Sequence, residues 1–462
     1  MTMETEMIDW TPKTEPNGKP RYIAIADAIE TDIRDGRLSP GNRLPPQRQL
    51  AKRLGIDFTT VSRGYTEAQT RGLVTSHVGR GTFVAKPTEA TIGPDPLRLA
   101  DEDLSMNLPP EPTDPRLIAN MRSGLDYVSA NLLQLLRYQS STGSDKDKAA
   151  ASTWLSLRGM IPSSARLVIS PGAHSTICAI LTILTDPGDT VLCEQITYPG
   201  FRNIASRRGL KLVGIEMDRD GILPDALSAA ITQHRPKALY LNPTLQNPTT
   251  LTIPTDRRLA ISEVLSKHGL PLIEDDAYGF IPAKAPAPIA VSAPDLTWHI
   301  GGLAKCIGAG LRLAYTVAPT GRLAYSLGQA LKVQAVMASP ITAALATQWI
   351  EDGTADQINR FIRAETSARQ AIAKEVLEGF DFQGAENAFN IWLSLPDGIG
   401  RADLVARMAG RPIGIMPSDA FSVGIAPEER VRLCLGGSLT RESLRANLYF
   451  LVNSLQSSAF LG

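Results

Sequence analysis

The fold is decided by the stretch Trp298-His-Ile-Gly-Gly-Leu-Ala-Lys305-Cys-Ile-Gly-Ala-Gly-Leu-Arg312-Leu-Ala-Tyr-Thr-Val317, in which one lysine lies in a glycine-rich turn. The pattern predicts a short strand, the turn, and a second strand that starts at Arg312. A lysine amine can form an imine with an aldehyde, and an arginine can bind a phosphate through a fork of N–H bonds. Lys305 and Arg312 together therefore indicate a site for a phosphorylated aldehyde cofactor.

Length and composition limit the number of domains and the kind of protein. A chain of 462 residues is too long for one ordinary domain and indicates two or three. Hydrophobic residues make up 43% and charged residues 20%, as is typical of globular proteins rather than disordered ones. The formal net charge is +0, which argues against a uniformly basic binder but can hide a local excess of charge.

The cysteines and the N-terminal residues predict the compartment. Four cysteines occur without a C-x-x-C pair, so they fit a reducing cytoplasm better than a disulfide framework or a metal site. Residues 1–10 lack the apolar segment of a signal peptide, and no apolar run of about 18 residues could span a membrane. We therefore expect a cytoplasmic protein that binds neither a membrane nor a metal.

Residues 20–86 show the pattern of a small helical module, and residues 1–19 before them predict a loose, polar tail. Three short helices are expected, which start at Arg21, at Pro45-Pro46 and at a cap on Thr59 or Thr60. Two short helices joined by a tight turn with a glycine make a helix-turn-helix. The segments 73–75 and 82–84 then predict a β-hairpin wing.

The charge of this module differs from that of the whole chain. Between Lys19 and Lys86 there are twelve basic and six acidic residues, and twelve minus six leaves an excess of six positive charges. Such a local excess favours contact with DNA phosphates, whereas the alternative is an ordinary solvated helical surface. We interpret the module as a DNA-binding winged helix.

Its motifs resemble the GntR-type winged helix. The matching motifs are the run Gly36–Ala51, Thr60-Val61, Tyr65, Gly72-Leu-Val and Gly79-Arg-Gly-Thr-Phe-Val84. The resemblance implies that Arg48 grips a phosphate of double-stranded DNA and that Gly79 lets the wing tip approach the minor groove. It directs three side chains to the major groove: Thr59, Thr60 and Ser62. Arg63 would lie beside the groove or on the outer face of its helix, and Phe58, where the family often has Arg or Ser, leaves the operator sequence open.

Residues 87–113 are rich in proline and acidic residues, which predicts a semi-extended linker. From residue 114 onward, short apolar segments alternate with helical ones and predict a buried, mostly parallel sheet. These segments lie at 167–170, 190–193, 238–241 and 272–275. A smaller α+β region is expected at about 353–462, with strands near 391–395, 411–416 and 431–435.

Six motifs of this second domain resemble, in order and spacing, the fold-type I, class I aminotransferases. They are Gly172-Ala-His174, Tyr198-Pro-Gly-Phe201, Asn247-Pro-Thr, Asp275-Asp-Ala-Tyr278, Lys305 with Arg312, and Arg432-Leu. The resemblance extends from about residue 114 to the C-terminus. With the winged helix in front, the whole chain is similar to the MocR (GabR-like) regulators.

The aminotransferase resemblance implies pyridoxal 5'-phosphate, carried by Lys305 as an internal imine, so that Lys305 is the catalytic residue. Asp275 would pair with the ring nitrogen, and Arg432 would take a carboxylate of the incoming effector. The remaining roles are binding of the ring oxygen by Asn247 and Tyr278, stacking by Tyr198, and phosphate binding by Ala173 and His174 backbone N–H groups and Arg312.

Two departures from the family pattern affect the expected site. Gly302 and Ala304 stand where the family carries hydroxyl residues, which removes two hydrogen bonds to the phosphate. Thr250 stands where the family has a glycine, so we expect a turn that does not need a positive φ.

These patterns favour a ligand-responsive transcription factor, in which an amino compound forms an external imine and alters DNA binding. The resemblance also implies a head-to-tail homodimer. One alternative is an active aminotransferase with an auxiliary DNA-binding domain. Another is a DNA-binding protein with an inactive enzyme domain, which the retained Lys305, Asp275, Asn247 and Arg312 disfavour. The effector is left open among amines, amino acids, taurine-like compounds and vitamers.

Overall fold

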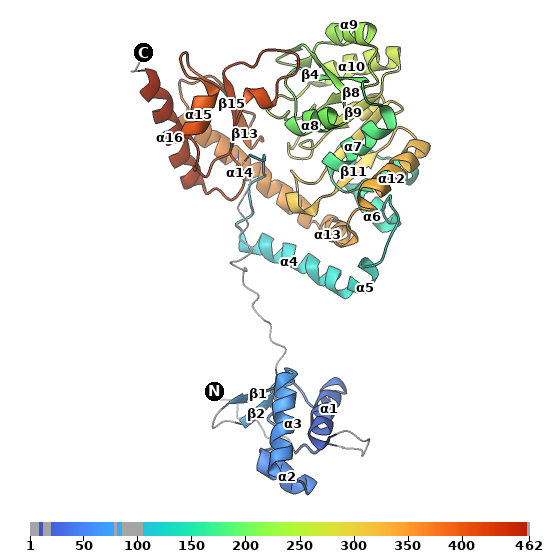
Figure 1. The fold of residues 1–462 in the computed structure, drawn as a ribbon, viewed down its shortest axis with the longest axis vertical. Helices are drawn as coiled ribbons and strands as arrows, with labels where there is room; N and C mark the ends of the chain where they lie inside the picture. The colour runs from blue at the N-terminus through green and yellow to red at the C-terminus, as the bar shows by residue number, and fades with distance from the viewer. Residues whose placement is uncertain (1–8, 13–19, 78–80, 86–104, 460–462) are drawn as a thin grey trace. The chain divides into compact units, whose positions relative to one another are not determined.

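The computed structural model describes residues 9–12, 20–77, 81–85 and 105–459 and divides into two units, Met1–Asp101 and Glu102–Gly462 (Figure 1). The first unit holds the predicted helix-turn-helix and its wing. Its elements are α1 (Arg21–Arg34), α2 (Gln47–Leu54), α3 (Phe58–Thr70), β1 (Val74–His77) and β2 (Gly81–Val84). The two strands pair antiparallel, with Val74 opposite Val84.

The ends of these helices follow from local chemistry. Pro46 precedes α2 as predicted, and Gly55 ends it in the left-handed conformation at φ 60°. The predicted cap of α3 at Thr59 or Thr60 is wrong, because the helix begins earlier. Asp57 caps it instead, and its carboxylate accepts hydrogen bonds from the backbone N–H of Thr59 (2.8 Å) and Thr60 (3.3 Å).

The expected loose tail is wrong for residues 9–12. Trp10 is 5% exposed and packs into the core of the first unit with Ile25 and Ile29. Its indole Nε1 donates to Asp32 Oδ2 at 2.7 Å, and Asp9 pairs with Arg53 at 2.5 Å. One aromatic residue in a polar segment is thus enough to attach these residues to the module.

Replacing Trp10 with alanine is expected to destabilise the first unit by about 3–5 kcal/mol, because it leaves a large cavity in a small core. The unfolding midpoint of that unit should fall by more than about 10 °C. Calorimetry of the full chain can follow it, and unfolding of the second unit is the internal control. An unchanged first transition would show that Trp10 is not part of the folded unit.

The second unit contains the predicted buried sheet, with the strand order β3-β11-β10-β9-β8-β4-β5. All neighbouring pairs are parallel except those of β11, which runs antiparallel to β10 and β3. The strands are β3 (Leu167–Ser170), β4 (Thr190–Glu194), β5 (Lys211–Ile215), β8 (Ala238–Leu241), β9 (Leu272–Asp275), β10 (Thr297–Gly302) and β11 (Ala314–Val317).

Helices cover both faces of this sheet. One face packs on α7 (Ala173–Leu184), α8 (Pro199–Arg207) and α12 (Gly321–Ala335), and the other on α9 (Pro224–His234) and α10 (Thr255–His268) (Figure 1). Because both faces are buried, every residue of β8, β9 and β10 is buried, as the continuous apolar runs predict. The remaining helices around the large sheet are α4 (Pro115–Ala130), α5 (Leu132–Leu135), α6 (Asp145–Ser156), α11 (Ile289–Ser292) and α13 (Pro340–Glu351), and β6 (Met217–Asp218) and β7 (Gly221–Ile222) form a short ribbon.

The smaller C-terminal region is an antiparallel sheet of order β12-β13-β15-β14. Its elements are α14 (Thr354–Val376), β12 (Phe382–Gln383), β13 (Asn390–Ser394), α15 (Arg401–Arg407), β14 (Ile415–Pro417), β15 (Arg430–Cys434) and α16 (Arg441–Ala459). The strand expected near 411–416 is shorter and later than predicted, because residues 411–413 form a bend after α15. The other two expected strands agree to within one residue.

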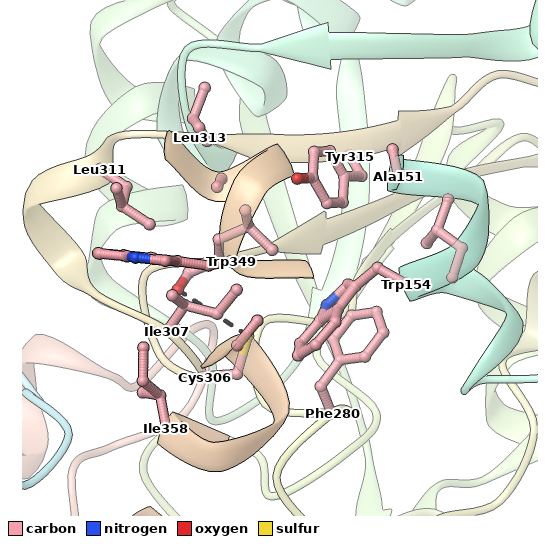
Figure 2. Packing of buried hydrophobic residues seen from close by; sticks show 14 of the residues in the cluster. Ala151, Trp154, Phe280, Cys306, Ile307, Leu311, Leu313, Tyr315, Trp349 and Ile358 are labelled. Carbon is pink, nitrogen blue, oxygen red and sulfur yellow. Dashed lines mark hydrogen bonds between the residues drawn. The ribbon is translucent and has the colours of Figure 1, made fainter. Parts of the chain in front are cut away.

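The lysine turn rests on an apolar cluster (Figure 2). Cys306, Ile307 and Leu311 from the turn belong to the same buried cluster as Trp349 and Trp154, and the Trp154 ring stacks on Phe280 at a centroid distance of 5.4 Å. Leu303, which precedes Lys305, and Cys306, which follows it, both belong to this cluster, so the turn is anchored on both sides of the lysine. The turn is therefore held rigidly although it contains two glycines, Gly308 and Gly310.

The expected linker at 87–113 extends too far. Residues 105–112 belong to the second unit, where Pro110 pairs with Gly437 beside β15. Prolines and acidic residues resemble a linker in composition, but here the backbone carbonyls of the segment are paired with the small sheet.

Candidate functional site

The site lies where strands of the large sheet end. Glu194, Leu241, Asp275 and Gly302 are the last residues of β4, β8, β9 and β10. Because β11 is antiparallel, its first residue Ala314 pairs with Gly302, which returns the chain to the same edge. This reversal brings Arg312 to the edge from which Lys305 projects.

The Lys305 side chain is half-buried. Its Nζ donates to the backbone carbonyl of Asn107 at 2.5 Å. Burial disfavours the charged amine, and the nearby Arg432 adds to this effect, so the pKa of Lys305 is lowered to about 8. A lysine of this kind has a substantial neutral fraction near neutral pH and can act as a nucleophile.

The rate at which pyridoxal 5'-phosphate is captured should therefore rise with pH up to about 8 and level off above it. Only the neutral amine attacks an aldehyde, and an ordinary lysine would require a pH near 10.5. Stopped-flow absorbance across pH 6–10 measures this profile. A midpoint near 10 would show that Lys305 is not desolvated.

Asp275 presents one carboxylate oxygen to the site. Tyr240, whose ring stacks on Phe201 at 3.9 Å, donates its hydroxyl to Asp275 Oδ2 at 2.8 Å. Among the residues that the structure describes, Oδ1 is buried with no hydrogen-bond partner. Burial raises the pKa of Asp275 to about 6, although the Tyr240 hydrogen bond favours the ionised form.

A second asparagine positions the predicted one. Asn242 accepts from the backbone N–H of Asn247 at 2.9 Å and donates its side-chain amide to the Asp275 carbonyl at 2.6 Å. The backbone N–H of Asn242 donates to buried Glu194 at 2.9 Å, and burial raises the pKa of Glu194 to about 7. This network connects three strand ends and fixes the loop that carries Asn247.

The turn after Asn247 differs from the expectation. Thr250 has a positive φ of 62°, so the prediction that this turn avoids the left-handed region is wrong. Its N–H donates to the Gln246 carbonyl at 2.6 Å, and its hydroxyl accepts from the Ala385 N–H at 3.1 Å. Contacts on both sides of the residue thus hold a threonine where a glycine would be unstrained.

Arg432 is buried in β15 at 3% exposure. Its guanidinium donates from Nη1 to Asn247 Oδ1 at 3.0 Å and from Nη2 to the Ser105 carbonyl, while its centre lies 5.4 Å from the Phe421 ring. Nε has no partner within the described part of the chain. These contacts argue against a surface salt bridge and leave the Nε donor available to a ligand.

The residues that were predicted to bind the phosphate of the cofactor lie at the start of α7. Gly172 precedes the helix with φ 87°, and a Cβ built there would lie 3.2 Å from the Arg312 guanidinium. Burial and Arg312 lower the pKa of His174. Gly302 lies beside Ala173, because a Cβ on Gly302 would be 3.6 Å from the Ala173 side chain. The helix start and the arginine therefore lie together at one corner of the site, and such an arrangement suits an anion.

Tyr278 and Tyr198, which were predicted to contact the cofactor ring, also lie close to the other site residues. The hydroxyl of buried Tyr278 accepts from the Asn107 side-chain amide at 3.2 Å. Tyr198 precedes α8, and its ring lies so close to Gly200 that any Cβ there would collide with it. Burial and the charge of Asp275 raise the pKa of Tyr198, which indicates that the two groups are neighbours.

The buried atoms fit pyridoxal 5'-phosphate. Asp275 Oδ1 is an acceptor for a protonated ring nitrogen, the Lys305 amine matches an aldehyde, and the corner at Arg312 matches a phosphate. Among the described residues, no cluster of three His, Cys, Asp or Glu side chains could hold a metal.

The DNA-facing residues predicted on α3 are engaged locally. The Thr59 and Thr60 hydroxyls donate to Asp57, and Ser62 is half-buried. Exposed Arg48 lies 5.9 Å from the Phe58 ring centre, whereas Arg63 lies 4.3 Å over the Tyr22 ring. Arg63 thus contacts α1 through Tyr22, and Gly79 lies outside the described residues.

Arg48→Ala is expected to weaken DNA binding by about 10-fold through loss of one charged contact, and to reduce the salt slope by about 1. Fluorescence anisotropy at several salt concentrations gives both values. Arg63→Ala is the matched control, because its guanidinium is stacked on Tyr22 and a smaller loss is expected. Equal losses for the two variants would argue against this docking.

Several site residues were not predicted: Tyr240, Asn242, Glu194 and Asn107. A signal existed for Asn242, since Asn242-Pro243 at a strand end repeats the Asn-Pro pair of Asn247-Pro248. No signal marked Asn107, which lies in a segment of linker composition.

Comparisons with known proteins agree with this geometry. Residues 103–448 match the family described as aminotransferase class I and II, and residues 21–84 match the bacterial regulatory proteins of the gntR family. The HTH-type transcriptional regulator YdeF of Bacillus subtilis is 29% identical over 457 residues, covering 97% of each chain. A regulatory protein of Rhizobium meliloti named for rhizopine catabolism, MocR, is 26% identical over 329 residues, covering 65% of this chain and 66% of its own.

The fold has solved relatives. An archaeal alanine:glyoxylate aminotransferase superposes with a TM-score of 0.70 at 22% identity, over 77% of this chain and 90% of its own. None of the helices in the described ranges is both long and apolar enough to cross a membrane. The chain belongs to the class I and II aminotransferase family, carries a gntR-type DNA-binding domain at its N-terminus, and so is a member of the MocR subfamily of regulators.

Proposed function

We propose that the protein is a transcriptional regulator that holds pyridoxal 5'-phosphate at Lys305 and changes its DNA binding when an amino compound occupies the site. The chain joins a gntR-type DNA-binding domain to an aminotransferase-like domain. The observation that carries the proposal is the set of reactive groups retained in the aminotransferase-like domain of a chain that also has a DNA-binding domain. It combines a lysine whose pKa is lowered to about 8 with Asp275 Oδ1 and Arg432 Nε, neither of which has a hydrogen-bond partner among the residues that the structure describes.

Bound pyridoxal phosphate supplies an aldehyde that condenses with primary amines and a ring that withdraws electrons. Lys305 would hold it and release a proton near neutral pH. Asp275 would keep the ring nitrogen protonated through Oδ1, while Tyr240 fixes the other oxygen. Asn247 and Tyr278 would bind the ring oxygen.

The outer contacts would set the position of cofactor and effector. Tyr198 would cover one face of the ring. The N–H groups of Ala173 and His174, with Arg312, would bind the phosphate. Arg432 would take a carboxylate of the effector, in keeping with its Nε, which has no partner in the described ranges of the chain. A small amine or amino acid is the ligand class that this arrangement suits.

The experiment follows two signals on purified full-length protein. Pyridoxal phosphate should produce an absorbance band of the bound cofactor, and a screen of amino compounds should find one that shifts it. That compound should change the affinity for a DNA duplex selected from a random library, without release of a keto acid over many turnovers. Absence of a cofactor band in the wild type would refute the proposal.

An active aminotransferase is the second candidate, because Lys305, Asp275 and Arg432 are all retained. Repeated turnover with keto acid release, and DNA affinity that does not depend on the amino compound, would favour the enzyme. Both candidates place the cofactor at Lys305.

A head-to-tail homodimer also forms part of the proposal. Large apolar side chains are exposed near α4 and α5, including Leu133 (73%), Leu136 (64%) and Tyr138 (85%). Monomeric proteins seldom expose such a group of apolar residues. Sedimentation equilibrium should therefore give twice the mass of one chain, and Leu133→Glu with Leu136→Glu should reduce it to one.

A further inference from the structure

The segment of residues 105–112, which we name the strap, contacts the site from one side. Its later half is anchored by backbone pairing. Gly437 donates to the Pro109 carbonyl at 3.2 Å, and Glu111 donates to the Gly437 carbonyl at 3.4 Å. A Cβ on Gly436 would stand 1.7 Å from the Leu108 carbonyl oxygen, so only a glycine there lets the strap lie this close.

The earlier half is bound through side chains of the site. The Ser105 carbonyl accepts from Arg432 Nη2, and the Met106 carbonyl accepts from the Cys434 thiol at 3.8 Å. The Asn107 carbonyl accepts from Lys305 at 2.5 Å. Asn107 itself is 2% exposed, and its amide donates to Tyr278 and Asn390.

Arg432 cannot bind a carboxylate fully while the strap is in place. A guanidinium binds a carboxylate side-on through Nε and the adjacent Nη2. Nε has no partner among the described residues, but Nη2 is occupied by the Ser105 carbonyl. A carboxylate carries a full charge and two acceptors, so it is the stronger partner and should displace a neutral carbonyl.

We propose that a carboxylate bound at Arg432 displaces Ser105 and releases the earlier half of the strap, while residues 109–111 stay paired with Gly437. Residues 86–104 connect Ser105 to the winged-helix unit along the chain. Release of Ser105 would thereby convert effector binding into a change in the segment that leads to the DNA-binding unit. This role rests on the proposed function, but the strap movement can be tested without cofactor.

Hydrogen–deuterium exchange of the full chain measures the strap directly. In Arg432→Ala, the peptide that contains residues 105–108 should exchange at least tenfold faster than in the wild type. Arg430→Ala is the matched control, since Arg430 lies on the same strand and pairs with Glu428 at 2.7 Å. Acetate, a bare carboxylate, should accelerate exchange in the wild type, whereas chloride at the same ionic strength should not. Unchanged exchange in both Arg432→Ala and acetate would overturn the proposal.

A second variant covers the case in which Arg432→Ala does not fold. Met106→Cys places a thiol on the residue whose backbone carbonyl lies 3.8 Å from the Cys434 sulfur, and oxidation with diamide should join the two sulfurs as the diamide is reduced. In the disulfide-locked protein, acetate should not accelerate hydrogen–deuterium exchange of the strap, and reduction with dithiothreitol should restore the acceleration. Met106→Cys with Cys434→Ser is the control that cannot be locked. An acetate response in the locked protein equal to that of the control would also overturn the proposal.

The two proposals fail separately. Loss of the cofactor band in the wild type refutes the function but leaves the exchange result in place. If the effector changes the DNA affinity of the wild type while the strap stays protected from hydrogen–deuterium exchange, only the proposal of strap release is refuted.

Discussion

Lys305→Ala is expected to abolish covalent attachment of pyridoxal 5'-phosphate completely, because the amine that forms the bond is removed. The wild-type absorbance band should be absent, and borohydride reduction should add the mass of the cofactor to the wild type alone. DNA binding should persist in the variant and should no longer respond to the amino compound. Absorbance, intact mass and anisotropy on the same preparations give the three results.

Lys148→Ala is a suitable control for this variant, since Lys148 is also partly buried, with burial lowering its pKa, but lies in α6. It should keep the band and the response. A Lys305→Ala protein that retains a covalently attached cofactor would show that another lysine forms the bond.

Asp275→Asn is expected to weaken pyridoxal phosphate binding by about 10- to 150-fold. The variant keeps the shape of the side chain but loses the charge that would pair with the protonated ring nitrogen, and a hydrogen bond to a charged group contributes about 1.5–3 kcal/mol. The absorbance of any bound cofactor should also shift to that of an unprotonated ring. Equilibrium dialysis and the pH titration of the band measure the two effects.

The neighbouring Asp276 gives a direct comparison. Its carboxylate accepts from Arg158 at 3.0 Å and Thr244 at 3.0 Å. Arg158 and the neighbouring His299, which lies 3.3 Å from the carboxylate, hold the pKa of Asp276 well below the ordinary range. Asp276→Asn should therefore lower the unfolding free energy, by about 3–5 kcal/mol for a broken buried pair, with little change in cofactor affinity. Equal loss of affinity in both variants would contradict the assignment of Asp275.

The order of motifs predicted the large sheet and the edge at which the site lies, because buried parallel strands read as continuous apolar runs. A second strand was predicted directly after the lysine turn, and this prediction placed Arg312 at the same edge of the sheet as Lys305. The antiparallel direction of β11 was not predicted, since a short strand of four buried residues reads alike in both directions. The sequence correctly predicted that Asp275 lies at the end of a strand. Its partner Tyr240 was not predicted, because their contact depends on the pairing of β8 with β9.

Residues held by distant contacts escaped prediction. Asn107 is fixed by Tyr278 and Asn390, which are far from it in the sequence, while its neighbours have the composition of a linker. Thr250 adopts a conformation that glycine prefers because Ala385 and Gln246 bond it on both sides. In both cases tertiary contacts override what the local sequence indicates.

The burial of Trp10 changes where the DNA-binding unit begins. The gntR family match starts at residue 21, so a fragment cut at that point would lack the indole that fills the core and bonds to Asp32. Trp10 is also the only tryptophan before residue 154, which makes its fluorescence a reporter of this unit alone in shorter fragments. A fragment intended for operator selection should therefore start before Asp9, and its emission spectrum would verify that the N-terminal residues have docked.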